Sequence, residues 1–576
     1  MVIVGGGISS GLVARQLTAK GIEVVVLERG GDRNGAESKI PTQRDELRWD
    51  IRSGLIQDAA SQTYSWRHSR SDDALPLRRM LAMLPGVGVG GAASHWNGQA
   101  WRWEEYDTVL RTRLESRYGK GAVPEDMPIQ DWGVTYAELE PYYDLFERLF
   151  GISGKAGNLR GRICEGGNPF EAPRANEYPQ PPLEFTESGL VFQEAAKKLG
   201  YRAFHSPAAN STGAYTNPDG MKLAPCQYCG HCGRFICEAN AKGSPDVLLY
   251  PLLENRPGFE LRRFCNVLKV NYDHDAGRVR GVDYIDLLTG QEYHQPAEVV
   301  VLGAFTLTNT RLLLAGGIGR PYDPQTRSGV VGKNFCFEMN IGMNLFVKDR
   351  WFNPFLSAGC SAVIVEEFND DNFDHSGLGF LGGGFIASGG IGRPIGSRPL
   401  PPGTPSWGSN WKQANADWYA HSFLIGVQGS CYPHRENFLD LDPDYQDAYG
   451  QPLLRITFDV RENERRMSDY CAEKAVEIAR AVGATHLGPV DISRAPFDTR
   501  VYQGTHVIGG TIMGADPSIS VVSPRLQHWD AENLFIVGGS VFPHNSGHNP
   551  TEPLAALALR LGDDLVGYFQ RPGRLG

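Results

Sequence analysis

The sequence predicts an α/β fold in which a dinucleotide-binding domain is joined to a second domain built on an antiparallel sheet. The chain opens on an apolar strand, a glycine-rich turn and a helix-compatible run to about Lys20, followed by a second strand at 22–28. Strand–turn–helix patterning returns after residue 500. At 576 residues the chain is also too long for one simple core.

The turn after the first strand has the glycines that a Rossmann-like fold requires. Gly5 suits the tight turn, and Gly7 lets the backbone approach a pyrophosphate. Ser10 stands where a third small residue packs the helix on the strand, and Gly11 follows it. Glu28 closes the second strand, where an acid binds the ribose hydroxyls of NAD or FAD and argues against NADP. The alternative is a glycine-rich turn without a ligand.

Composition and charge argue against several classes of partner. The net charge is −10 and there is no long basic run, so nucleic acid and anionic membrane surfaces are poor partners. No apolar stretch reaches the roughly eighteen residues that a membrane-spanning helix needs. The chain starts directly in the first strand, without a signal peptide, and a trimmed N-terminus is one explanation.

The remaining segments divide between two domains. Residues 105–220, rich in Pro, Tyr and Trp, are predicted to form an inserted cap, and 335–500 the rest of a substrate domain. Strands within 256–302 are expected to return to the first sheet. The expected dinucleotide domain comprises 1–104, 221–334 and 501–576, and the expected substrate domain comprises 105–220 and 335–500.

Five segments, in order along the chain, resemble the glucose–methanol–choline (GMC) flavoprotein oxidoreductases. They are the N-terminal glycine turn, PGVGVGGAASHWNG (85–98), GAFTLTNTRLLLAGGIG (303–319), THVIGGTIMG (505–514) and NLFIVGGSVFPHNSGHNPT (533–551). Within the family, HWNG, CEANAK, ISGKAGN and GGTIMG look most like the flavoprotein subunits of bacterial gluconate 2-dehydrogenases and sugar dehydrogenases. The resemblance implies FAD, and oxidation of a sugar, sugar-acid, glycoside or polyol hydroxyl by hydride transfer to flavin N5.

Oxidising an alcohol requires a base for the hydroxyl proton as well as a hydride acceptor. His506 and Asn549 stand where the family holds the base and its partner, and a neutral imidazole accepts a proton near neutrality. The alternative is a core histidine and a helix cap. His544 and His548 are expected to be supporting or surface residues, because neighbours on an extended segment point to opposite sides.

The resemblance also implies contacts with the flavin. His95 stands where related enzymes attach the 8α-methyl group of FAD covalently, and the alternative is a histidine packed against the ring without a bond. Asn97 would face the N5/C4a edge of the flavin. The other implied cofactor contacts are Arg29, Gly90, Gly91, Gly98, Val267, Gly303, Ala304, Gly538, Gly539, Asn549, Pro550 and Thr551.

Four cysteines, Cys226, Cys229, Cys232 and Cys237, crowd into twelve positions. All four come from one loop, as in iron–sulfur ligation, whereas zinc sites usually combine ligand pairs from separate loops. Cys-x₂-Cys disulfides are strained. A 3Fe–4S or 4Fe–4S cluster is therefore predicted, with zinc or unligated or disulfide-bonded cysteines as alternatives, and His231 could replace one thiolate.

The leading prediction is a dehydrogenase that passes electrons through this cluster to an external acceptor. The resemblance implies a small subunit and a multihaem cytochrome c subunit, with export to the periplasm on the small subunit's signal; otherwise the protein would be cytoplasmic. One alternative is an oxidase of pyranoses, glycosides or aminoglycosides whose cysteine loop is structural. Another is an electron-transfer subunit whose partner binds the substrate, and the intact His506 and Asn549 argue against it.

Overall fold

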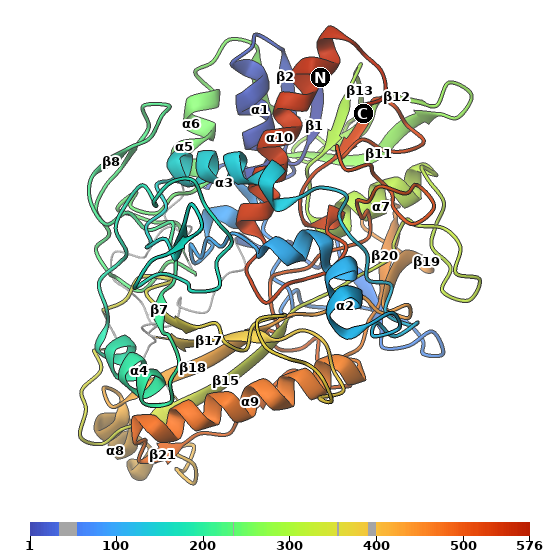
Figure 1. Cartoon of the computed structure of the whole chain (residues 1–576). Coiled ribbons are helices and arrows are strands. Elements are labelled where there is room, and N and C mark those ends of the chain that lie inside the picture. The colour runs from blue at the N-terminus through green and yellow to red at the C-terminus, as the bar shows by residue number, and fades with distance from the viewer. Residues whose placement is uncertain (34–54, 234, 354–355, 390–398, 576) are drawn as a thin grey trace.

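The computed structural model describes residues 1–33, 55–233, 235–353, 356–389 and 399–575. The glycine turn and its strands lie at one end of the molecule, and an antiparallel sheet lies at the other (Figure 1). Segments far apart in sequence meet at the first end, where the N-terminal helix α1 (Ile8–Thr18) packs against the C-terminal helix α10 (Thr551–Gln570). The predicted mixed α/β fold is confirmed.

The first sheet has five parallel strands in the order β10-β2-β1-β14-β23. Four of its strands are largely buried runs rich in Val, Ile and Leu, as expected where helices cover both faces of a parallel sheet, while the edge strand β10 is only partly buried. β1 aligns Val2 with Val25 on one side and with Val300 on the other. The strands are β1 (Val2–Val4), β2 (Val24–Leu27), β10 (Phe259–Arg262), β14 (Val300–Leu302) and β23 (Leu534–Ile536).

The expectation that all strands within 256–302 join the first sheet is wrong. Only β10 and β14 do so, while β11 (Cys265–Asp273), β12 (Arg278–Asp286) and β13 (Glu292–Pro296) form a separate antiparallel sheet. Short turns join these strands, so neighbouring strands satisfy each other's backbone hydrogen bonds locally. Helix α7 (Thr306–Gly316) packs against β11.

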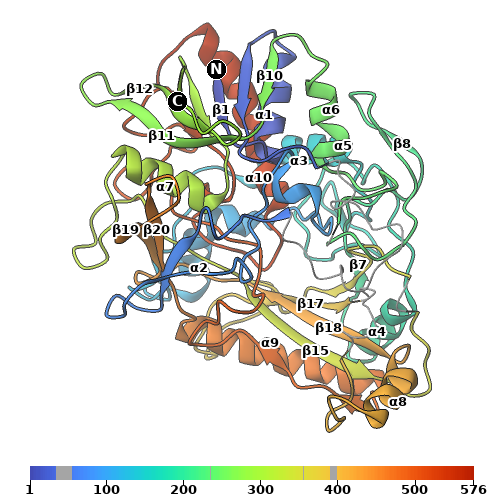
Figure 2. The same ribbon diagram turned by 180° about the vertical axis from the view of Figure 1, so that it is seen from behind.

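The opposite end of the molecule is built on a seven-stranded sheet. The long helix α9 (Glu462–Val482) lies along this sheet, as both ribbon views show (Figures 1 and 2). Helix α4 (Glu187–Lys198) packs against α9 and the same sheet. The strands are β7 (Phe204–His205), β15 (Met339–Phe346), β16 (Val363–Val365), β17 (Gly384–Gly389), β18 (Ser422–Gly429), β21 (His486–Leu487) and β22 (Asp491–Ile492).

A four-stranded sheet combines the N-terminal strands β3 (Tyr64–Arg67) and β4 (Leu75–Pro76) with β19 (Phe438–Gln446) and β20 (Pro452–Thr457). The other elements are two hairpins and short helices. They are β5 (Asn158–Leu159), β6 (Arg162–Ile163), β8 (Tyr215–Thr216), β9 (Lys222–Leu223), α2 (Leu110–Tyr118), α3 (Tyr136–Phe150), α5 (Pro245–Leu248), α6 (Tyr250–Leu253) and α8 (Ser409–Trp418).

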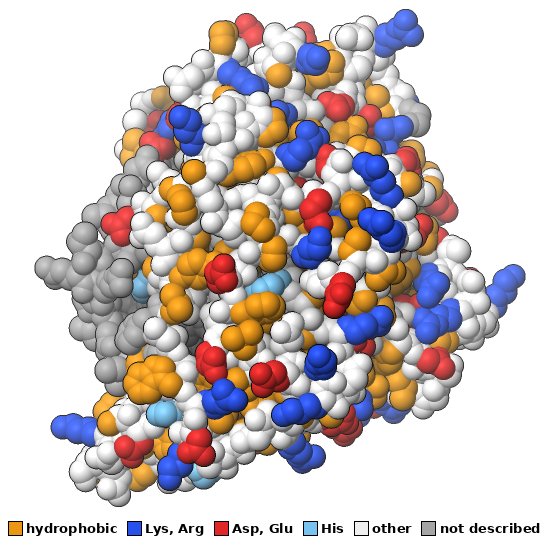
Figure 3. All heavy atoms as spheres, turned by 60° about the vertical axis from the view of Figure 1, so that its left-hand side comes forward, with side chains coloured by type: hydrophobic (Ala, Val, Ile, Leu, Met, Phe, Trp, Pro, Cys, Tyr) orange, Lys and Arg blue, Asp and Glu red, His pale blue; other side chains and the backbone are white. Residues whose placement is uncertain are grey.

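Acidic and basic side chains are interspersed over the face of the molecule shown in Figure 3. That face therefore presents no single-sign field of the kind that attracts nucleic acid. Among the helices that the structure describes, none is both long enough and apolar enough to cross a membrane.

Candidate active site

A cavity of about 1810 Å³ lies where the C-terminal ends of the parallel strands meet the antiparallel sheet. One wall carries the glycine turn and the ends of β1, β2 and β14; the other carries Glu338, Asn340, Leu424 and Gln428. A crevice at the carboxyl ends of parallel strands is the usual ligand site of such folds. The predicted site residues in its lining are Gly5, Gly7, Glu28, Arg29, Gly90, Gly91, His95, Asn97, Val267, Gly303, Ala304, His506, Gly538, Gly539, Asn549, Pro550 and Thr551.

Two of the predicted cofactor residues, Ser10 and Gly98, are not part of this lining. Ser10 is fully buried and donates its hydroxyl to the carbonyl of Gly303 at 3.2 Å, so it packs α1 against β14. Gly98 has a φ of +94°, and a Cβ there would lie 3.0 Å from Oδ1 of Asn210. Both residues therefore pack behind the residues that line the cavity and do not line it themselves.

The glycine positions fit a dinucleotide that lies against the backbone. At Gly7 an added Cβ would meet only the carbonyl oxygen of Gly303, 4.0 Å away, so the missing side chain leaves open space. At Gly538 the single neighbour within range is the carbonyl oxygen of Ala304 at 3.7 Å. Helix α1 begins directly after Gly7, and a helix N-terminus favours phosphate groups.

Glu28 fixes the shape of this turn. Its Oε2 accepts a hydrogen bond from the amide of Gly6 at 2.6 Å, and its Oε1 accepts from Gly30 at 2.7 Å and Gly88 at 3.1 Å. A carboxylate has about four acceptor positions, so three amides leave room for one further donor. That position is where a ribose hydroxyl would bind.

His506 and Asn549 meet at the cavity wall. Nδ2 of Asn549 lies 3.1 Å from Nε2 of His506, and the carboxylate of Glu338 contacts Nδ1 of the same ring. An ionised carboxylate only accepts hydrogen bonds, so Nδ1 carries the proton and Nε2 presents its lone pair. The accepting nitrogen of the ring therefore faces Asn549, whose NH₂ donates to it.

Sequence reasoning missed Glu338, which lies 168 residues from His506 and immediately before β15. Its side chain is 4% exposed, and Nδ2 of Asn340 lies 3.2 Å from its Oε1. A buried carboxylate beside a histidine stabilises the imidazolium that forms when the ring accepts a proton. Glu338 lies in no recognisable sequence motif. It meets the imidazole of His506 only because segments distant in the sequence pack together in the fold.

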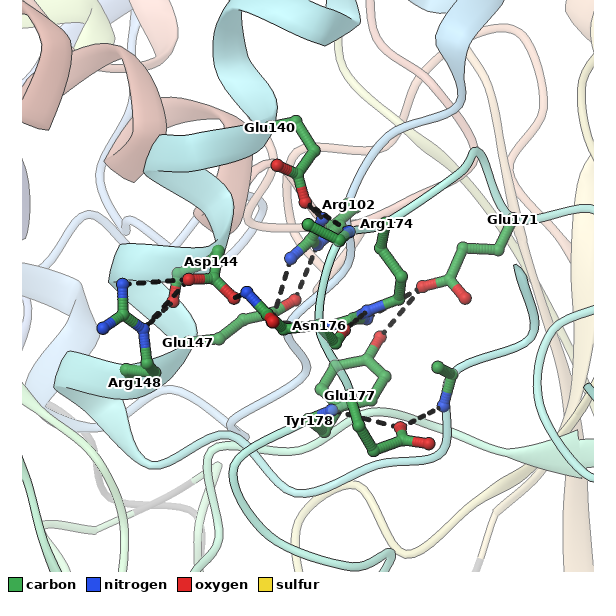
Figure 4. Close-up of polar contacts among 12 residues, drawn as sticks. Arg102, Glu140, Asp144, Glu147, Arg148, Glu171, Arg174, Asn176, Glu177 and Tyr178 are labelled. Atoms are coloured by element: carbon green, nitrogen blue, oxygen red, sulfur yellow. Dashed lines mark hydrogen bonds and ion pairs between the residues drawn. The ribbon is translucent and has the colours of Figure 1, made fainter. Parts of the chain in front are cut away.

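The turn that carries Asn549 is held from two sides. Nε1 of Trp103 donates to the backbone carbonyl of Asn549 at 3.1 Å, and Nε2 of Gln428 lies 3.3 Å from its Oδ1. Trp103 follows Arg102, which belongs to a buried ionic network (Figure 4).

This network anchors the segment of chain behind the Asn549 turn. Nε and Nη2 of Arg102 donate to the two carboxylate oxygens of Glu147 at 2.7 and 3.0 Å, and Nη1 donates to Glu140 at 2.9 Å. Arg174 contacts the same Glu147 and donates to Glu171 at 2.9 Å. The side chains of Arg102, Glu147 and Arg174 are at most 1% exposed, so each charge depends on its partners.

His544 and His548 were expected to be supporting or surface residues, and the second alternative is excluded because both side chains are completely buried. Nε2 of His548 lies 2.8 Å from Oε1 of Glu366, and its ring stacks on Trp101 at 4.7 Å. Burial alone would lower the pKa of His548. The negative charge of Glu366 and its hydrogen bond to the ring have a larger opposite effect, so the pKa is raised. Neither histidine lines the cavity, whereas His95 and His506 do.

Comparison with known proteins now identifies the fold. Two family models, both described as GMC oxidoreductase, match residues 184–345 and 433–558. The gluconate 2-dehydrogenase flavoprotein of Pantoea cypripedii is 43% identical over 584 residues, which cover 100% of this chain and 94% of that protein. The chain belongs to the GMC oxidoreductase family. The predicted resemblance is confirmed.

More distant proteins of known activity are similar over the same length. The fructose dehydrogenase large subunit of Gluconobacter japonicus is 27% identical over 595 residues, covering 99% of this chain and 98% of that one. The solved pyridoxine 4-oxidase from Mesorbium loti has a TM-score of 0.59 at 16% identity, covering 98% and 99%. As a GMC oxidoreductase, the chain is a flavoenzyme that oxidises CH–OH groups.

The cysteine loop of this GMC chain lies beside the cavity. Gly230 and Gly233, which alternate with the loop cysteines, are part of the cavity lining, and a Cβ at Gly233 would lie 3.7 Å from Cβ of Asn97. Cys226 is half-buried, and its burial, followed by the neighbouring loop thiols, raises its pKa to about 12. The four thiols therefore share one neighbourhood next to the predicted flavin edge.

The geometry argues against a disulfide in this loop but does not distinguish zinc from an iron–sulfur cluster. All ten cysteines are among the described residues, and none forms a disulfide. Within the described part of the chain, no three His, Cys, Asp or Glu side chains converge as ligands of a single metal ion. A donor set of several thiols in one tight loop remains the chemistry of iron–sulfur ligation.

Proposed function

We propose that the chain is an FAD-dependent sugar-acid dehydrogenase that oxidises a hydroxyl to a carbonyl and sends the electrons out through its cysteine loop. The observation that carries this proposal is the triplet Glu338–His506–Asn549 on the wall of a cavity suited to FAD. Similarity along the whole chain to a gluconate 2-dehydrogenase flavoprotein supports the substrate class.

The residues of the triplet divide the chemistry between them. FAD, when bound, supplies the hydride acceptor. Nε2 of His506 accepts the hydroxyl proton, and Glu338 holds the opposite nitrogen and stabilises the charge that the ring gains. Nδ2 of Asn549 donates to the substrate oxygen, since an amide NH₂ cannot take the proton itself. Trp103 and Gln428 keep that amide in place.

A carboxylate on the substrate is supported by the charge of the cavity wall. Arg78 and Arg79 line the cavity, and neither guanidinium has a carboxylate partner among the described residues. Their segment lies beside His506, because the carbonyl of Ala82 accepts hydrogen bonds from the amides of Gln503 and Gly504 at 3.2 and 3.1 Å. These two guanidinium groups could pair with the carboxylate of a sugar acid, while Glu28, Asp58 and Glu338 line other parts of the same cavity.

The cysteine loop supports an electron route that begins at the flavin. We propose that Cys226, Cys229, Cys232 and Cys237 supply the ligands of a 3Fe–4S or 4Fe–4S cluster, which would provide a one-electron acceptor next to the cavity. The acceptor beyond it would be a multihaem cytochrome c subunit, with a small signal-bearing subunit that takes the folded chain to the periplasm. The name of one relative, a large subunit, supports such an assembly.

His95 lies in the cavity lining, two residues before Asn97. We propose that its imidazole binds the 8α-methyl group of FAD covalently, which would retain the cofactor during turnover. The buried position of His95, which is 5% exposed, supports a permanent contact with the flavin.

The decisive experiment compares substrates and acceptors on protein purified without oxygen. Gluconate should reduce the flavin, while glucose, fructose and paromamine should do so at least about tenfold more slowly, because they lack the carboxylate. An artificial dye should be reduced faster than O₂. Arg79→Ala should lower the ratio of the flavin-reduction rates with gluconate and with glucose. Arg500 is exposed and lies outside the cavity lining, so Arg500→Ala should leave that ratio unchanged. Preferred turnover with O₂ would instead establish an oxidase.

A further inference from the structure

A buried carboxamide joins the cysteine loop to a cysteine far from it in sequence. Nδ2 of Asn210 lies 3.4 Å from Sγ of Cys232 and 3.8 Å from Sγ of Cys226. On the other side of the same amide, Sγ of Cys360 lies 3.5 Å from Oδ1. Asn210 is 1% exposed and Cys360 2%, so water does not compete for these contacts.

The backbone holds Asn210 firmly in this place. The amide of Ala209 donates to the carbonyl of Gly98 at 2.7 Å, and Asn210 itself pairs with Lys242 in an antiparallel bridge. Gly98 leaves little space beside Oδ1, since a Cβ there would lie 3.0 Å away. The side chain is therefore confined between the Asn97–Gly98 segment and the cysteine loop.

The direction of the amide follows from its three sulfur neighbours. Its oxygen only accepts and its NH₂ only donates hydrogen bonds, whereas a thiol can donate. The Cys360 thiol donates to Oδ1, which turns the NH₂ toward Cys226 and Cys232. Cys360 can thus influence the loop sulfurs through the orientation of the Asn210 amide.

Cys232 is also tied to the cavity side of the loop. Nζ of Lys242 donates to the carbonyl of Cys232 at 3.0 Å and to the carbonyl of Trp96 at 2.7 Å. Gly359 lies between the same two segments, because a Cβ there would be 2.3 Å from the carbonyl oxygen of Asn97 and 2.5 Å from Cβ of Cys232. The sulfur that Asn210 contacts at 3.4 Å therefore belongs to the part of the loop packed against the flavin-facing chain.

We propose that Asn210, oriented by Cys360, is a positioning residue that sets the reduction potential of the cysteine loop's cluster. Its NH₂ donates to the sulfurs of Cys232 and Cys226, and donation to a ligand sulfur favours the reduced, more negative state. Asn210 and Cys360 together raise the reduction potential of the cluster, and a higher reduction potential favours electron transfer from the reduced flavin to the cluster. This role rests on the cluster proposed above.

The test measures the potential of the holoprotein by EPR-monitored reduction, with iron and sulfide content determined for each variant. Asn210→Ala should lower the potential enough to reduce the equilibrium constant for cluster reduction about tenfold, as expected for loss of a hydrogen bond to a charged group. Cys360→Ala should shift it in the same direction. Cys360→Ser retains a hydroxyl that can donate to Oδ1 of Asn210, so it should keep the wild-type reduction potential. Cys471 is a buried cysteine on α9, and Cys471→Ala should also keep that potential.

The outcomes separate this role from the proposed cluster. Wild-type protein without iron and sulfide would overturn both. A wild-type cluster whose potential is unchanged in Asn210→Ala and Cys360→Ala would overturn the role of Asn210 alone. If Asn210→Ala loses its iron, the comparison of Cys360→Ala with Cys360→Ser decides, and equal potentials in those two variants would refute the proposal.

Discussion

Nδ2 of Asn549 lies 3.1 Å from Nε2 of His506, although 43 residues separate them in the sequence. The imidazole is held at both nitrogens, by Asn549 on the cavity side and by Glu338 behind it. A ring fixed in this way needs little rearrangement to accept a proton from a hydroxyl placed beside Asn549.

Replacing His506 should abolish flavin reduction by substrate while leaving the fold intact. His506→Ala removes the imidazole that we propose takes the hydroxyl proton, and a general base contributes about 10²- to 10⁴-fold. Anaerobic stopped-flow absorbance of the flavin gives the rate. His294→Ala, an exposed change on β13, serves as the control, and a near-normal rate in His506→Ala would refute the assignment.

Glu338→Gln should slow the same step by about a hundredfold, the low end of a general base's contribution. The amide keeps the size of the side chain but supplies no negative charge to the imidazolium, and it can donate to Nδ1 and select the wrong tautomer. Flavin content should not change. The exposed Glu462→Gln on α9 is the matched control, and equal flavin-reduction rates in the two variants would contradict the role of Glu338.

Acid precipitation should carry the flavin into the pellet with the wild-type chain. His95→Ala should release it to the supernatant, because the bond to the 8α-methyl group is absent, although FAD remains bound before denaturation. Absorbance at the flavin band in the two fractions measures the partition. His68→Ala, outside the lining, is expected to behave like wild type. Flavin in the supernatant of wild-type protein would exclude covalent attachment.

Glu147→Ala should lower the free energy of unfolding by about 3–5 kcal/mol, since it leaves two buried guanidinium groups without their shared carboxylate. The change also frees the segment that carries Trp103, so substrate turnover should fall with stability. Thermal unfolding followed by circular dichroism checks the first effect. Glu165→Ala, an exposed residue, should change little, and an equally small shift in Glu147→Ala would contradict the prediction.

Asp107 should make the protein less stable as the pH rises. Burial raises its pKa from 3.8 to about 7 in the folded chain. Because the folded pKa exceeds the unfolded value, stability from this group is complete below pH 3.8 and is lost as the pH rises toward 7.

Asp107→Asn keeps an acceptor for the amide of Glu104 and removes the titration. Its urea midpoint, relative to wild type, should therefore be higher at pH 8 than at pH 5. Asp73→Asn, an exposed change, gives the baseline. The same difference from wild type at both pH values would show that Asp107 does not titrate in this range.

The sequence predicted those parts of the site that local chain geometry determines. A strand, a glycine turn and a helix are encoded within about twenty residues, and the structure places Gly5, Gly7 and Glu28 as the dinucleotide pattern requires. His506 and Asn549 were predictable because each lies in a family motif. The Rossmann-like α/β fold was also predictable from these patterns, whereas the order of the five strands was not.

Residues that act through long-range pairing were not predictable. Glu338 immediately precedes β15 and belongs to no motif, so its contact with His506 depends on how the two sheets pack. Cys360 and Asn210 are likewise brought to the cysteine loop by separate segments. The β11–β13 sheet was misassigned because alternating apolar residues show that a strand exists but not which partner it pairs with.

The strand order of the first sheet dictates when the enzyme can mature. β1 pairs with β14, and β14 pairs with β23, whose residues 534–536 leave the ribosome only after nearly all of the chain has been made. Until then β14 has an open edge, and the Asn549–Thr551 end of the cavity has not been synthesised. The complete cavity wall therefore cannot form around a cofactor before residues 549–551 have been synthesised.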